Sequence, residues 1–155
     1  MLHSSTTRLA TAFLLTITFG VTSVFAQSAL DGAWEVTHAK SDSVEYDQPG
    51  LYLFQGEYYS VLHVWSSEPR PLYEEDEGRG SVDLERLRAV VGPVEGNSGK
   101  YAIDGSTVTL TPMVAISPNF MNGGSSTYTF SINGDELTLQ TEEDGGRELT
   151  LHRLH

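Results

Sequence analysis

The feature that most constrains the fold of this chain is a series of short runs with alternating side chains, separated by glycine-containing turns. The densest pair of runs lies at residues 49–65 and flanks Gln55-Gly56-Glu57. Aromatic and branched residues on both sides of such a turn predict a β-hairpin. Because both faces of the second run carry large side chains, we expect at least part of this hairpin to be covered on both sides.

The same alternation predicts six further strands. In the first, residues 31–38, the side chains of Trp34, Val36 and His38 are expected on one face. The later runs follow at close intervals, and glycine-containing turn signals separate several of them. These runs are residues 99–104, residues 107–111, residues 127–132, the run that contains Leu137 and Leu139, and residues 147–153.

Two longer stretches break the pattern of strands. Residues 66–97 contain several prolines and glycines and an acidic run at residues 74–77. Within this stretch, helical spacing of apolar residues predicts one short helix over residues 83–91. Residues 112–125 form the second irregular stretch. Long loops in a compact domain commonly act as lids or binding loops, so both stretches are candidate lids.

Short, evenly spaced strands with tight turns are typical of a sandwich or a barrel. Eight strands in mostly sequential order favour an all-β fold, an eight-stranded antiparallel up-and-down barrel with one short helix in a long loop. Such a barrel leaves no open sheet edge. Its interior is just wide enough either to pack solid or to hold one small ligand.

The N-terminal residues are identified as a secretory signal peptide, residues 1–26. A weakly basic start precedes an apolar run, and Val24-Phe25-Ala26 places small residues at the cleavage positions before Gln27. We therefore expect one domain, residues 27–155, to be periplasmic or secreted. No Cys follows the cleavage site, which excludes a lipoprotein anchor, and no other stretch is expected to span a membrane.

The charge of the chain excludes some classes of partner. Its formal net charge is −12, and it becomes more negative when Arg8 leaves with the signal peptide. An acidic chain without a basic patch repels phosphate, so neither nucleic acid nor an anionic membrane surface is an expected partner. The chain has no Cys, which excludes disulfides and thiolate zinc sites.

Gly32-Ala33-Trp34 at the start of the first strand resembles the G-x-W motif of the lipocalin superfamily. Three segments, G-L-Y-L-F-Q-G-E-Y-Y-S-V-L-H-V, N-S-G-K-Y-A-I-D-G-S-T-V-T-L and P-N-F-M, make the chain similar to the bacterial lipocalin-like domain family over about residues 30–151. The T-D-Y motif of standard lipocalins is absent. The resemblance implies a small exported barrel in which Gly32 and Trp34 close one end and Trp34 stacks under Arg153.

A barrel of this kind holds its ligand among inward-facing aromatic and polar side chains. The candidates from the strands and one loop are Tyr52, Phe54, Tyr59, Val61, His63, Arg70, Tyr101, Phe120, Met121, Tyr128 and Phe130. Which face of the 50–65 hairpin points inward stays open. His63 is either a core residue or a ligand contact. Arg70 either pairs with a ligand carboxylate at the barrel mouth or offsets the nearby acidic run.

No catalytic motif or metal-binding spacing occurs in the chain, and nothing points to a cofactor. The sequence therefore predicts binding of a small apolar or amphipathic molecule inside the barrel. Two alternatives stay open. One is an enzyme of the isomerase or cyclase type that uses the same pocket. The other is a protein-binding or inhibitor module with a solid barrel and an apolar patch around Phe120 and Met121.

Overall fold

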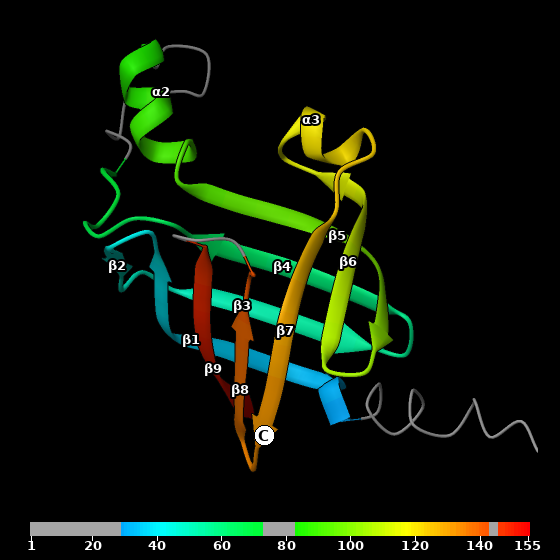
Figure 1. Ribbon diagram of the computed structural model, residues 1–155. Coiled ribbons are helices and arrows are strands. Elements are labelled where there is room, and N and C mark those ends of the chain that lie inside the picture. The colour runs from blue at the N-terminus through cyan, green and yellow to red at the C-terminus, as the bar shows by residue number, and fades with distance from the viewer. Residues whose placement is uncertain (1–28, 73–82, 143–145) are drawn as a thin grey trace, which may run out of the picture.

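The computed structural model describes residues 29–72, 83–142 and 146–155 (Figure 1). Its elements, in chain order, are β1 (Gly32–Ser41), β2 (Val44–Tyr46), β3 (Gly50–Gln55), β4 (Tyr58–Val64), α2 (Leu84–Val91), β5 (Val94–Asp104), β6 (Thr107–Ala115), α3 (Pro118–Met121), β7 (Ser126–Asn133), β8 (Glu136–Gln140) and β9 (Arg147–Leu154). The predicted signal peptide and the acidic run at residues 74–77 lie outside the described residues.

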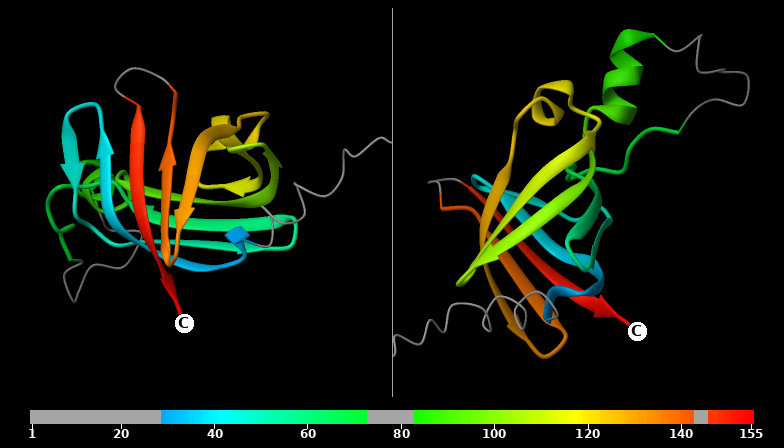
Figure 2. Two further views of the ribbon diagram at one scale, coloured as in Figure 1. Left: turned by 60° about the horizontal axis from the view of Figure 1, so that its bottom comes forward. Right: turned by 90° about the vertical axis from the view of Figure 1, so that its right-hand side faces the viewer.

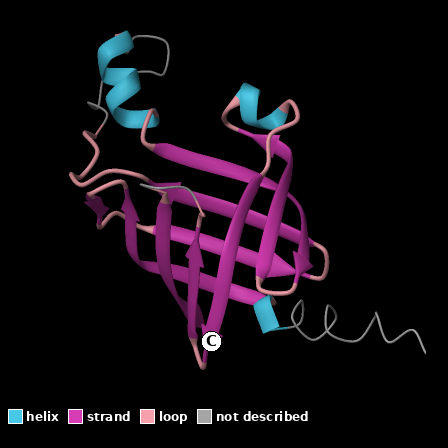
Figure 3. Cartoon of the chain, viewed as in Figure 1, coloured by secondary structure: helices cyan, strands magenta, loops and turns pink. Residues whose placement is uncertain are grey.

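Eight of these strands close into an antiparallel barrel, as the sequence predicted. The strand order is β1-β3-β4-β5-β6-β7-β8-β9, and β1 also pairs with β9, so the sheet has no free edge within the barrel. The short strand β2 pairs with the far end of β1, beside the barrel proper. Figure 3 shows the strands wrapped around one interior, with α2 and α3 above it.

The central hairpin is β3 and β4, joined by a two-residue turn at Gly56-Glu57, where Gly56 has a φ of 60°. Its inward face carries Tyr52, Phe54, Tyr59, Val61 and His63, which are all buried. The outward face is mostly exposed to solvent: Leu62, for example, is 58% exposed. The prediction that at least part of the hairpin is covered on both sides is met at the end of β4, where His63 and Val64 are both buried.

Two β-bulges change which side chains face the interior. In β1 the register with β9 shifts between Val36 and His38, so Trp34 and Ala39 are both buried while His38 is not. The prediction that His38 shares a face with Trp34 was wrong because the extra residue at the bulge reverses the alternation. A second shift lies between β5 and β6, next to Gly99.

The irregular stretches contain more regular structure than the sequence predicted. Strand β5 begins at Val94, inside the stretch read as broken, and β6 continues through Pro112 to Ala115. A second short helix, α3, follows, with the Ser117 hydroxyl accepting a hydrogen bond from the backbone N–H of Phe120 at 3.3 Å. The predicted helix is present as α2, capped by Asp83.

One end of the barrel is packed solid. The Arg153 guanidinium lies 4.0 Å from the centre of the Trp34 ring. The Trp34 Nε1–H donates to the carbonyl oxygen of Leu30 at 2.8 Å, and Arg153 donates to the carbonyl oxygens of Asp31 and Ala29. Gly32 has a φ of 137°, and a Cβ there would lie 2.8 Å from Arg153 Nη1. Above this end the core is filled by Val108, Leu110, Leu137, Leu139, Leu149 and Leu151.

Candidate functional site

The opposite end of the barrel is open and holds a cavity of about 1350 Å³. Figures 1 and 2 show α2 and α3 on this side of the barrel, while the C-terminus lies at the closed end. The cavity is lined by the ends of β1, β5, β6, β7 and β9, by Trp65, and by residues from α2, α3 and the loops beside them.

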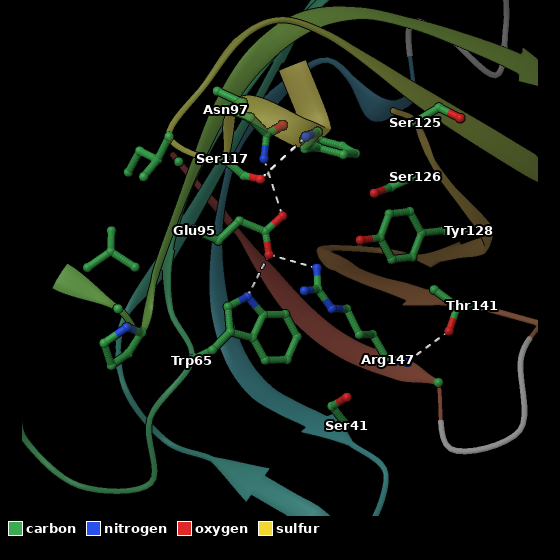
Figure 4. Close-up of a pocket in the computed structure, with 18 of the residues that line it drawn as sticks. Ser41, Trp65, Glu95, Asn97, Ser117, Ser125, Ser126, Tyr128, Thr141 and Arg147 are labelled. Atoms are coloured by element: carbon green, nitrogen blue, oxygen red, sulfur yellow. Dashed lines mark hydrogen bonds and ion pairs between the residues drawn. The ribbon is translucent and has the colours of Figure 1, made fainter. Parts of the chain in front are cut away.

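A polar cluster lines the inner part of this cavity (Figure 4). Its centre is the Glu95 carboxylate. Oε2 accepts hydrogen bonds from Trp65 Nε1 at 2.8 Å and from Arg147 Nη1 at 2.7 Å, and Oε1 accepts one from Asn97 Nδ2 at 3.2 Å. The Tyr128 hydroxyl points toward these groups from β7. We call Trp65, Glu95, Asn97, Tyr128 and Arg147 the polar cluster.

Strand ends hold the members of this cluster in place. The backbone N–H of Trp65 donates to the carbonyl oxygen of Pro93 at 2.8 Å, which fixes the end of β4 beside the start of β5. Arg147 begins β9, and its backbone N–H donates to the Thr141 hydroxyl at 2.8 Å. Residues 95 and 97 both face inward on β5 because side chains alternate along a strand.

The Glu95–Arg147 ion pair makes the cluster electrically neutral. The two side chains are only 20% and 38% exposed. Burial alone lowers the pKa of Arg147, but the attraction of Glu95, with Tyr128 and Tyr52 nearby, outweighs burial and leaves this pKa raised. The guanidinium also lies 4.5 Å from the centre of the Trp65 ring. The ion pair with Glu95 and the contact with the Trp65 ring therefore hold the charged guanidinium in one position.

Tyrosine hydroxyls near the pair stay protonated at neutral pH. Burial, followed by the negative charge of Glu95, raises the pKa of Tyr59 to about 12 and also raises the pKa of Tyr128. Burial likewise raises the pKa of Tyr52 well above its ordinary value. These hydroxyls can both donate and accept hydrogen bonds. No described residue hydrogen-bonds the buried hydroxyls of Tyr52 and Tyr59.

His63 lies next to the cluster and is fully buried. Its ring centre is 4.4 Å from that of Trp65, and its β5 neighbour is Glu95. Burial, and then the charge of Arg147, lower the pKa of His63 to about 4. The imidazole is therefore neutral at pH 7. His63 is not among the residues that line the cavity, and it contacts the polar cluster through the Trp65 ring.

Apolar side chains surround the outer part of the cavity. Leu87 and Val91 reach it from α2, and Phe120 reaches it from α3. These three residues, which we call the rim, are all at least partly exposed. The exposed charged residues Asp42, Arg88 and Glu142 also line the cavity. The cavity thus combines the polar cluster with apolar side chains from the two helices.

The residues predicted for the pocket divide into three groups. Tyr128 and Phe120 line the cavity. Most of the others are buried deeper in the barrel, namely Tyr52, Phe54, Tyr59, Val61, His63 and Tyr101, with Phe130 partly buried against them. Met121 is 45% exposed beside the cavity, and Arg70 is exposed and donates to the carbonyl oxygen of Val90 at 3.0 Å instead of lining the cavity.

Four members of the polar cluster were missed among the sequence candidates: Trp65, Glu95, Asn97 and Arg147. Alternation contained a signal for all four. Trp65 has the same parity as Val61 and His63, and Arg147 has the same parity as Leu149 and Leu151. Extending β5 backward from Tyr101 in steps of two also reaches Asn97 and Glu95. Glycines and a proline beside these two residues masked that strand.

Two searches of the described residues gave negative results. No group of three or more His, Asp or Glu side chains in residues 29–72, 83–142 and 146–155 is arranged to hold a metal ion. Within the same ranges, none of the helices has the length and apolar character needed to cross a membrane.

No protein-family model matches this chain, and no curated protein matches it. One solved structure that resembles it is the crystal structure of an uncharacterized protein from Bacteroides eggerthii DSM 20697 at 2.60 Å resolution. The two chains are 12% identical, the match covers 81% of this chain and 99% of that chain, and the TM-score is 0.44. At this level of similarity the neighbouring structure indicates no function for this chain. The residues that line the cavity are therefore the basis for a functional proposal.

Proposed function

We propose that this protein is an exported, lipocalin-like barrel that binds a small amphipathic molecule in the open end of its interior. The observation that carries the proposal is that one cavity contains both the polar cluster and the apolar side chains of the rim. An amphipathic molecule matches both, with its polar group at the Glu95–Arg147 pair and its apolar body against the rim. The G-x-W start and the N-terminal pattern support the lipocalin-like and exported parts of the proposal.

The energetic terms favour such a ligand. Burial of apolar surface contributes roughly 25 cal/mol per Å², so contact with Leu87, Val91 and Phe120 supplies affinity. The polar cluster supplies orientation, because Glu95 and Arg147 are already held in one geometry and lose little freedom on binding. The protein-binding alternative, in contrast, predicts that no small molecule binds in this cavity.

A fluorescence titration with N-phenyl-1-naphthylamine, an uncharged apolar probe, tests the proposal. We expect saturable binding to the wild-type protein. The variant Ser126→Trp places a large ring on the inward face of β7 at the cavity and should weaken binding at least tenfold. The control Thr129→Trp places the same ring on the exposed face of the same strand and should bind like the wild type.

Native mass spectrometry of protein purified from its own export compartment complements the titration. A co-purifying small molecule that is lost in Ser126→Trp would support the proposal and give the ligand class. A protein that is empty and binds no probe would contradict it.

A further inference from the structure

The polar cluster defines what kind of group the cavity accepts at its inner end. Glu95 already receives three hydrogen bonds, from Trp65, Asn97 and Arg147. Its charge and that of Arg147 balance each other across 2.7 Å. A charged ligand group would add a third charge to a partly buried pair, and it would face one member of like sign. Burying a charge without its own partner is strongly unfavourable.

The same region contains an uncharged acceptor without a partner and several hydroxyl groups, which can donate or accept. Asn97 is only 7% exposed, lines the cavity and donates through Nδ2 to Glu95, while its Oδ1 accepts no hydrogen bond from any described residue. The Tyr128 hydroxyl also points into the cavity. Hydroxyl groups of Ser41, Ser117, Ser126 and Thr141 belong to the cavity lining as well. An amide oxygen left unpaired in a buried site costs stability, and a ligand donor removes that cost.

Resting on the function proposed above, we propose that the ligand is an electrically neutral amphipath whose head group both donates and accepts hydrogen bonds, as a carboxamide does, and enters the barrel head-first. The head donates to Asn97 Oδ1 and accepts from Tyr128 or Arg147. Its apolar body lies between α2 and α3 against the rim. Glu95 and Arg147 neutralise each other and thereby exclude both carboxylates and ammonium groups.

A series of ligands with one common chain and different heads tests this proposal. Decanamide, N,N-dimethyldecanamide, decanoate and decylammonium would each compete with N-phenyl-1-naphthylamine for the protein at neutral pH. We expect decanamide to bind at least about tenfold more tightly than either charged ligand, because the charged heads find no free counter-ion in the site. The dimethyl amide has no N–H to give to Asn97 Oδ1 and should bind about tenfold more weakly than decanamide.

Two variants assign the selectivity to the polar cluster. In Asn97→Leu the difference between decanamide and its dimethyl form should disappear, because the acceptor is gone. In Glu95→Gln the positive charge of Arg147 is left uncompensated, and decanoate should bind about tenfold more tightly than to the wild type. The control Glu57→Gln makes the same change in the exposed Glu57–Lys100 pair outside the barrel and should keep the wild-type order. Thermal melts would verify that each variant is folded.

The outcomes separate this proposal from the proposed function. If decanoate or decylammonium binds the wild type best, or if all four ligands bind equally, the neutral-head proposal is overturned while the cavity still binds amphipathic molecules. If the probe itself does not bind, both proposals fail. Tightest binding of decanamide in the wild type, together with the two changes in the variants, supports both.

Discussion

His63 shows how strongly the barrel interior acts on a single side chain. It is fully buried, and no described residue hydrogen-bonds either of its ring nitrogens. Burial and the charge of Arg147 lower its pKa from 6.5 to about 4. As the pH falls, the unfolded chain therefore takes up a proton before the folded chain does. The stability that neutral His63 contributes is complete above about pH 6.5 and is lost as the pH approaches 4.

The corresponding prediction concerns the pH dependence of folding. Between about pH 7 and about pH 4.5, the free energy of unfolding of the wild type should fall by up to about 3 kcal/mol more than that of His63→Phe. Urea denaturation of both proteins at the two pH values measures this difference, since the carboxylates titrate in both. Parallel loss of stability in the two proteins would mean that folding does not hold His63 neutral.

At the scale of elements, α2 supplies apolar contacts to the cavity with only part of its surface. Leu87 and Val91 line the cavity, whereas Leu84, one turn earlier in the helix, is 61% exposed and lies outside it. Figure 2 shows α2 above the barrel, away from its packed core. Val90 is the buried residue of this helix, so α2 contributes little to the packed core.

We therefore expect Leu87→Ser and Val91→Ser each to weaken binding of N-phenyl-1-naphthylamine by about three- to tenfold, as the loss of apolar contact area predicts. The melting temperature should change little, because both side chains are partly exposed. Leu84→Ser makes the same change on the same helix outside the cavity and should bind like the wild type. An equal effect of all three substitutions would show that they weaken binding by destabilising α2 and not by removing contacts in the cavity.

The elements also show why the fold was predictable and the site was not. Alternation and two-residue turns such as Gly134-Asp135 identified the barrel strands, because each turn leaves the period of two intact. A bulge reverses that period without changing composition, which is why His38 was assigned to the wrong face. Gly96 lies in a strand because Ile116 covers the space where its side chain would be. A contact of this kind comes from a residue that is distant in the sequence, so the local sequence pattern around Gly96 does not predict it.

The same reasoning explains why Glu95 and Arg147 were overlooked. Charged residues inside a barrel contradict the expectation that inward positions are apolar, and a search for apolar faces passes over them. They are acceptable there because the two charges meet across strands that are 52 residues apart in the chain. Only the closed sheet, with β9 returning to β1, brings them together.

For the whole molecule, closure of the barrel depends on a short segment before the first strand. Leu30 is fully buried, and its carbonyl oxygen accepts the hydrogen bond from Trp34 at 2.8 Å. The carbonyl oxygen of Ala29 accepts one from Arg153 at 2.7 Å. These bonds connect the start of the barrel to its last strand at the packed end. Cleavage after Ala26, as the sequence predicts, would leave this segment in the mature protein.

Two truncated chains test this dependence. A chain that starts at Gln27, where the predicted cleavage would begin the mature protein, keeps Ala29 and Leu30 and is the reference. A chain that starts at Asp31 loses the buried Leu30 side chain, the carbonyl acceptor of Trp34 and one of the two carbonyl acceptors of Arg153. Its free energy of unfolding should fall by about 3 kcal/mol or more. Leu30→Ala in the longer chain keeps the backbone acceptors and should have a smaller effect, about 2 to 3 kcal/mol. Equal stability of the two truncated chains would show that β1 and β9 close the barrel without the preceding segment.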